Sequence, residues 1–70
     1  MEYRNVNSSN IKQIGYDMKK RVLRIIFHSG AVYDYTDVDQ NVYSDFISAP
    51  SIGKYFSVRI KNAYPYVRKI

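Results

Sequence analysis

The chain has 70 residues, and 11 lysines and arginines against 6 acidic residues give it a formal net charge of +5 at pH 7. This length supports one domain with one small core, and the absence of cysteine excludes disulfides and thiolate metal sites. A single histidine cannot build a zinc cluster, and no apolar run approaches the roughly 20 residues that span a bilayer. We therefore expect one domain over residues 1–70, soluble and cytoplasmic, with no cofactor, no metal and no membrane segment.

The first two elements that we predict along the chain are strands. IKQIGY at 11–16 is the first, although Gly15 weakens it, and DMKKR after it is a polar turn. VLRIIFH at 22–28 is the second, because its residues alternate between two faces. One face carries Leu23, Ile25 and Phe27, and the other carries Val22, Arg24, Ile26 and His28.

A third strand follows a tight turn. The pair SG at 29–30 suits a hairpin, because Gly30 tolerates a positive φ. AVYDYT at 31–36 then returns antiparallel, with Tyr33 and Tyr35 on one face. The three strands form an antiparallel meander.

The hydrophobic period then changes from two to about 3.6, which predicts two helices. Asp39 caps the first, at 40–47, and SAP at 48–50 stops it. Ser51 caps the second, IGKYFSVRIKNAY at 52–64, which Pro65 ends. Its apolar stripe comprises Ile52, Tyr55, Phe56, Ile60, Ala63 and Tyr64. The tail YVRKI could pair as a short edge strand or trail free, and we favour pairing.

These elements predict an α+β fold, a three-stranded antiparallel β-meander with two C-terminal α-helices packed on one face. A small sheet needs an apolar partner, and the two amphipathic helices supply it. The uncovered face carries Val22, Ile26 and Val32. We expect that face to serve an oligomer or a protein partner, if one exists.

The order of motifs resembles the KTSC domain family, named after the C-terminal extension of certain lysyl-tRNA synthetases and found also as small bacterial and phage proteins. The matching residues are SSNI at 8–11, IGYD at 14–17, LRIIF at 23–27, Gly30, YDY at 33–35, VYSDF at 42–46, APSIGKYF at 49–56, IK at 60–61 and Tyr64. Asp39 departs from the family, which often has proline there. The resemblance implies an antiparallel sheet with helices and a nucleic-acid-binding role, with no known reaction.

Tyr33 and Tyr35 are the first candidate binding residues, because an exposed aromatic pair on a sheet can stack nucleic-acid bases. The alternative is that both rings cover the core. Their cross-strand partners share the face of Leu23 and Ile25, the more apolar one. We therefore favour a place in the core or at its edge.

The start of the second helix is a candidate anion site, because unpaired N–H groups and the helix dipole can hold a negative charge. Ser51 offers a hydroxyl, Gly53 permits close approach and Lys54 adds charge. The spacing is not that of a nucleotide-binding P-loop, and a simply capped helix is the more common interpretation.

Basic residues supply the third candidate site. Arg24, Lys54 and Lys61 could contact phosphates, in which case binding would fall steeply with salt. Arg59 lies close to the apolar stripe, so we expect it to bury its stem and pair with an aspartate. His28 has no carboxylate at a catalytic spacing, and we expect no enzyme and no catalytic residue.

The leading hypothesis is a small non-enzymatic module that binds RNA or single-stranded DNA through a basic, tyrosine-rich surface. Arg24, Lys54 and Lys61 would contact phosphates, and Tyr33 or Tyr35 would stack. One alternative is a protein-interaction or host-modulating adaptor that acts as a homo-oligomer. Another is a site for an anionic small molecule or nucleotide at 51–54.

Overall fold

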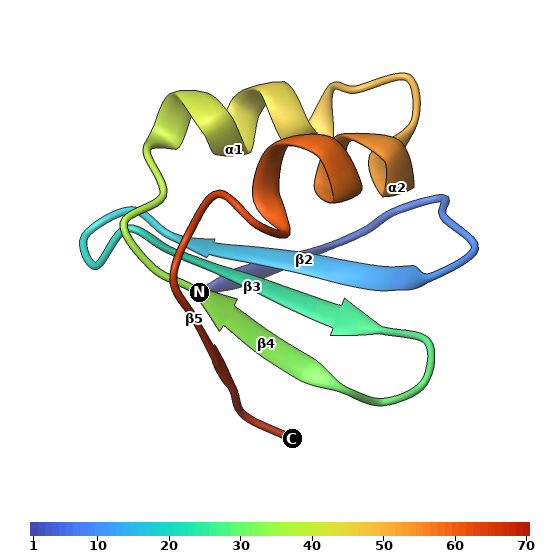
Figure 1. Cartoon of the computed structure of the whole chain (residues 1–70), viewed down its shortest axis with the longest axis horizontal. Coiled ribbons are helices and arrows are strands. Elements are labelled where there is room, and N and C mark those ends of the chain that lie inside the picture. Colours follow the sequence, from blue (N-terminus) through green and yellow to red (C-terminus); the bar gives the residue numbers. More distant parts are fainter.

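Alternating apolar residues fold the first half of the chain into a β-meander that the following helices cover. The computed structural model describes residues 1–70 as a sheet of five antiparallel strands in the order β1-β2-β3-β4-β5, with the helices on one face (Figure 1). The elements are β1 (Glu2–Asn5), β2 (Ile11–Asp17), β3 (Val22–Phe27), β4 (Val32–Tyr35), α1 (Gln40–Ile47), α2 (Ile52–Tyr55), the π-helical turn η1 (Phe56–Ile60) and β5 (Tyr66–Arg68). The predicted α+β class is confirmed.

The predicted number of strands is wrong, because the sheet has five strands and not three. The additional N-terminal strand β1 pairs with β2, and all four of its residues are exposed. It therefore lacks the alternation of buried and exposed positions that predicts a strand from sequence. The other additional strand is β5, which pairs with β4 as expected for the tail.

The core lies between the sheet and the helices. Leu23 and Ile25 of β3 are fully buried, and Phe46 of α1 and Ile60 of η1 close over them. The ten buried apolar residues are Ile11, Ile14, Leu23, Ile25, Tyr35, Val38, Phe46, Ile52, Phe56 and Ile60. Only one face of the sheet is buried, and this fixes the register of strand pairing, because a slip by one residue would expose this whole set.

Short polar side chains fix the connections between the elements. The Ser8 hydroxyl accepts hydrogen bonds from the N–H groups of Asn10 and Ile11, which orders the turn into β2. Gly30 has φ of +95° in the β3–β4 hairpin, as its place in the tight turn predicts. The side chain of Asp39 accepts a hydrogen bond from the Asn41 N–H and caps α1, as predicted.

The second helix differs from the continuous α-helix expected over 52–64. After one α-helical turn, the Lys61 N–H donates to the Phe56 carbonyl at 2.8 Å, which is the wider i→i+5 pattern of a π-helix. Phe56 and Ile60 both remain buried. The helical structure stops at Ile60, so Ala63 lies exposed in the following turn and is not part of the apolar stripe.

Arg59 is also placed differently from the expectation. Its side chain is exposed on η1, and the only ion pair of the protein joins Arg24 to Asp34. The expected pairing of Arg59 with an aspartate is therefore wrong, because η1 turns this residue away from the sheet. None of the helices combines the length and the apolar character needed to cross a lipid bilayer.

Candidate binding cleft and the opposite sheet face

A cleft of about 640 Å³ opens where the β3–β4 hairpin, the turn before β2 and the helical segment η1 meet. Buried Ile11, Tyr35 and Phe56 form its apolar floor. The other lining residues are Ser9, Asn10, Phe27, His28, Ser29, Ala31, Tyr33, Gly53, Ser57, Lys61, Asn62 and Tyr66. One lysine and one histidine are among the 15 lining residues, and no aspartate or glutamate is. The cleft therefore favours an uncharged or anionic ligand.

Three tyrosines from neighbouring strands form one wall of this cleft. The ring centroids of Tyr33 and Tyr35 lie 6.4 Å apart, and Tyr66 of β5 lies 5.4 Å from Tyr33 and 5.5 Å from Tyr35. Tyr35 also packs edge-on against Phe56 at 5.7 Å. The three rings thus continue the aromatic part of the core out to the surface.

The exposed fraction of each ring shows whether it belongs to the core or to a surface on which bases could stack. Tyr35 is 3% exposed and is a core residue, while Tyr33 is half-buried at the core edge. Burial raises the pKa of the Tyr35 hydroxyl above its ordinary value, and the nearby Tyr66 and Tyr33 add to this effect. Tyr66 is 55% exposed, so it offers the most accessible ring.

Tyr66 is not among the binding residues that the sequence predicts, because strand pairing of the tail does not by itself select a residue. Antiparallel pairing sets Tyr66 opposite Tyr35, and residues directly opposite each other point to the same face. The predicted pairing of the tail was the available signal, because it brings an aromatic residue close to a tyrosine strand. The register that selects Tyr66 required the structure.

Positive charge lies beside this tyrosine wall. Lys61 is exposed at the end of η1 and lines the cleft. The guanidinium carbon of Arg68 lies 5.7 Å from the centroid of the Tyr33 ring, which is cation–π distance. His28 lies on the opposite rim, with its Nε2 atom 3.0 Å from the Ser8 carbonyl oxygen.

The residues of the predicted anion site lie together at the start of α2, but only Gly53 among them lines the cleft. The Ser51 hydroxyl accepts a hydrogen bond from the Lys54 N–H at 3.3 Å, so it is used as a helix cap. Ser51 and Lys54 are exposed and do not line the cleft, whereas Gly53 does. A Cβ atom on Gly53 would lie 3.5 Å from the Ser8 hydroxyl, which is ordinary van der Waals contact, so this position faces the turn before β2 without requiring glycine.

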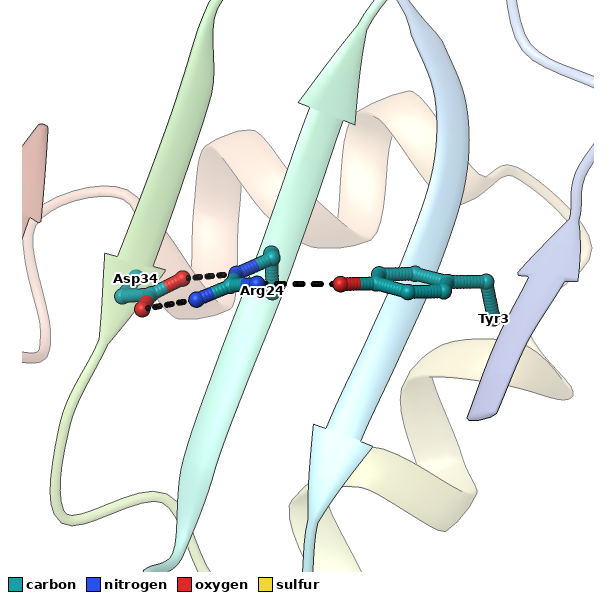
Figure 2. A network of polar contacts seen from close by, with 3 residues as sticks. All are labelled: Tyr3, Arg24 and Asp34. Atoms are coloured by element: carbon teal, nitrogen blue, oxygen red, sulfur yellow. Dashed lines mark hydrogen bonds and ion pairs between the residues drawn. The ribbon is translucent and has the colours of Figure 1, made fainter. Parts of the chain in front are cut away.

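Arg24 lies on the face of the sheet opposite the helices and the cleft. Its Nε and Nη2 atoms donate to the two carboxylate oxygens of Asp34 at 2.6 and 2.9 Å, and its Nη1 atom donates to the Tyr3 hydroxyl at 2.9 Å. Figure 2 shows the three side chains in one row across the strands, with the helices behind the sheet. These hydrogen bonds raise the pKa of Arg24 above its ordinary value. Arg24 is thus separated from Tyr33, Tyr35 and Lys61.

Gly15 makes this row possible. The Tyr3 ring crosses β2 on its way to Arg24 (Figure 2), and it does so at the position of Gly15. A Cβ atom on Gly15 would lie 2.8 Å from Cε1 of Tyr3 and 2.8 Å from Sδ of Met1. The glycine that weakened the strand prediction therefore provides the space that the Tyr3 ring occupies.

Comparison with known proteins identifies the family. The sequence model of the KTSC domain family matches residues 7–64 of the chain. The chain belongs to the KTSC domain family. The KTSC domain protein of Yersinia pestis has a similar solved structure, with a TM-score of 0.94 and 33% sequence identity over 99% of this chain and 97% of that chain.

Two relatives show where such sequences occur. A lysine–tRNA ligase of Nostoc punctiforme is 41% identical over 58 residues, which are 83% of this chain and 10% of the ligase. This KTSC chain thus spans about a tenth of the length of that relative. An uncharacterized protein of Stutzerimonas stutzeri is 35% identical over 74% of this chain and 73% of its own length.

Proposed function

We propose that this KTSC domain is a non-enzymatic module that binds single-stranded nucleic acid, RNA above all, in the aromatic cleft. A base stacks on the Tyr66 ring, with Tyr33 behind it. The adjoining phosphates contact Lys61 and Arg68. Arg24 takes no part, because Asp34 and Tyr3 on the opposite face already engage it.

One observation carries this proposal: the exposed Tyr66 ring and Lys61 line a cleft without acidic residues, and Arg68 lies beside that cleft against the Tyr33 ring. Tyr66 is 55% exposed, and Lys61 and Arg68 are exposed near it. Single-strand binding proteins use this combination, in which aromatic rings stack bases and a positive groove follows the backbone. The net charge of +5 favours polyanions at longer range.

The names of the relatives also support RNA as the ligand. A protein named lysine–tRNA ligase contains a segment similar to this chain, and that name describes an enzyme that acts on tRNA. The similar segment is a tenth of the ligase, a size suited to an accessory binding domain. We therefore favour RNA over single-stranded DNA as the ligand.

The magnitude of each contribution follows from known single-strand binders. Loss of one base–aromatic stack costs about 1–3 kcal/mol, so Tyr66→Ala should weaken binding about five- to 150-fold. Each phosphate contact with a single strand contributes about 0.7 to the slope of log K against log salt concentration. Lys61→Ala should therefore reduce this slope by about 0.7.

The test is a fluorescence anisotropy titration of short unstructured RNA and DNA oligonucleotides at several salt concentrations. Tyr66→Phe keeps the ring and should bind like the wild type, whereas Tyr66→Ala should not. Lys19→Ala removes one charge from the distant β2–β3 turn and is the matched control for Lys61→Ala. Absence of binding at low salt, or equal binding by Tyr66→Ala and the wild type, would overturn the proposal.

The same titration separates a nucleotide site from a strand site. A mononucleotide should bind far more weakly than an oligonucleotide if Lys61 and Arg68 contact successive phosphates. Equal affinity for a mononucleotide and an oligonucleotide would instead favour the second candidate, a small-molecule site. The buried apolar residues Ile11 and Phe56 beneath a polar rim are the observation that favours this candidate.

A further inference from the structure

The face of the sheet opposite the helices is left uncovered by the fold (Figure 1). Strand pairing sets Tyr3, Gly15, Arg24, Asp34 and Val67 in one row across this face. A second row consists of Asn5, Gln13, Ile26 and Val32. Ile26, Val32, Val67 and the Tyr3 ring therefore surround a single ion pair, and the hydrogen-bonded Asn5 and Gln13 lie at one edge of the face.

The charge of this face differs from that of the rest of the protein. Three basic residues are paired across neighbouring strands. Two of them, Arg4 and Arg68, pair with Ile14 and Tyr33 and therefore point to the helix side of the sheet. Only Arg24 points to the uncovered face, where Asp34 neutralises it. Among the strand-paired residues this face therefore carries one cation, Arg24, and two carboxylates, Asp34 and Asp17, so it has no surplus of positive charge.

The carboxylate of Asp34 is unusually protected for a group on an open sheet. Its side chain is 10% exposed, and that of Arg24 is 28% exposed. Both carboxylate oxygens accept hydrogen bonds from Arg24. A charged pair that has already lost much of its water loses little more when a second surface covers it.

We propose that this uncovered face is an isologous interface between two copies of this chain. A two-fold axis parallel to the strands, between β3 and β4, sets Arg24 of one copy over the partner's Asp34, and the partner's Arg24 over Asp34. The row of opposite charges is therefore complementary to itself. Elsewhere, two copies of a protein with a net charge of +5 repel each other.

Apolar residues on both sides of the ion pair supply the contact area. Ile26 and Val32 are half-buried at the centre of the face, and Val67 and Tyr3 are 55% and 44% exposed. Five strands spaced about 4.8 Å apart make a face about 20 Å across, which is smaller than a standard interface. We therefore expect a reversible dimer of micromolar or weaker affinity. The cleft lies on the other side of the sheet and stays open in both copies.

The test is sedimentation equilibrium or light scattering from low micromolar to near-millimolar concentration. The wild type should approach twice the 8.2 kDa mass of one chain as the concentration rises. Added salt should strengthen association, because it screens the repulsion between two positive chains and leaves the apolar contact intact. Nucleic-acid binding depends on salt in the opposite direction.

Ile26→Lys should abolish association, because it places two lysines in the centre of the dimer. Val67→Lys on the exposed edge strand is the second variant, since its position is more tolerant of change. Val58→Lys is the matched control, because Val58 is 67% exposed on η1, on the other side of the molecule. Circular dichroism of each variant verifies the fold.

Loss of the dimer in the two face variants, with the dimer of Val58→Lys unchanged, would support the proposal. A wild type that stays monomeric at every concentration would overturn it. A dimer that persists in folded Val67→Lys and Ile26→Lys would also overturn it, because the contact would then lie elsewhere. These outcomes are independent of whether the cleft binds nucleic acid.

Discussion

Removal of the Asp34 carboxylate should destabilise the monomer strongly, although this residue belongs to a sheet face that no helix covers. In Asp34→Ala, Arg24 loses both of its charge-assisted hydrogen bonds to the carboxylate. The guanidinium then remains partly buried, with the Tyr3 hydroxyl as its one protein acceptor. The loss therefore combines the missing attraction with the cost of an unpaired charge.

The exposures of the two side chains set the magnitude. An exposed ion pair contributes about 0–1 kcal/mol, and removal of one partner from a buried pair costs about 3–5 kcal/mol. The side chains of Asp34 and Arg24 are 10% and 28% exposed, which lies between these cases. We expect Asp34→Ala to lower the free energy of unfolding by about 2 kcal/mol and the melting temperature by about 10 °C.

The assay is urea and thermal unfolding followed by circular dichroism at low micromolar concentration, which limits self-association. Asp45→Ala, on the exposed face of α1, is the matched control and should change stability by less than about 0.5 kcal/mol. A double-mutant cycle with Arg24→Ala should give a coupling energy of about 1–2 kcal/mol. Strictly additive single variants would refute the reasoning.

Three further predictions concern backbone and pH. Gly15→Val should lower the free energy of unfolding, measured in urea, by about 1 kcal/mol or more, because the new Cβ atom displaces the Tyr3 ring. Tyr3→Phe removes only one hydroxyl and should lower it by less. Gly30→Val should cost about 1–2 kcal/mol by the same measurement, since φ is +95° while the space around the residue is open. Burial raises the pKa of Tyr35 above its ordinary value, so its neutral hydroxyl favours the folded state at neutral pH. Stability should fall as the pH rises through the folded pKa, which far-UV ellipticity measured against pH would show.

Local sequence signals predicted the centre of the fold well. Alternation predicted β3, and the pair at 29–30 predicted the hairpin into β4. Asp39 caps its helix as expected, because N-capping depends only on neighbouring residues. Such features depend on short stretches of chain, so a single sequence contains the information that determines them.

Features that depend on distant contacts could not be predicted in the same way. The strand β1 has no buried residue, and its ring contact at Gly15 joins positions 12 residues apart in the chain. The wider turn of η1 has no local signature, since the same apolar spacing also fits an ordinary α-helix. Both features depend on the assembled sheet.

The candidate site was predicted in part. Tyr33, Tyr35, Gly53 and Lys61 do line one cleft. Charge alone groups Arg24 with Lys54 and Lys61, whereas strand alternation puts Arg24 on the face opposite Leu23, Ile25 and the tyrosines. Charge is a property of the whole surface, so only the strand register shows which cations share a face.

The most direct test of the proposed function is a heteronuclear NMR titration of the protein with an unstructured RNA oligonucleotide at low salt. The account predicts that the largest shift changes lie at the backbone amides of Tyr33, Ser57, Lys61 and Tyr66 around the cleft. The amides of Arg24 and Ile26 on the opposite face should change little. Changes confined to that opposite face, or no changes at saturating RNA, would contradict the account.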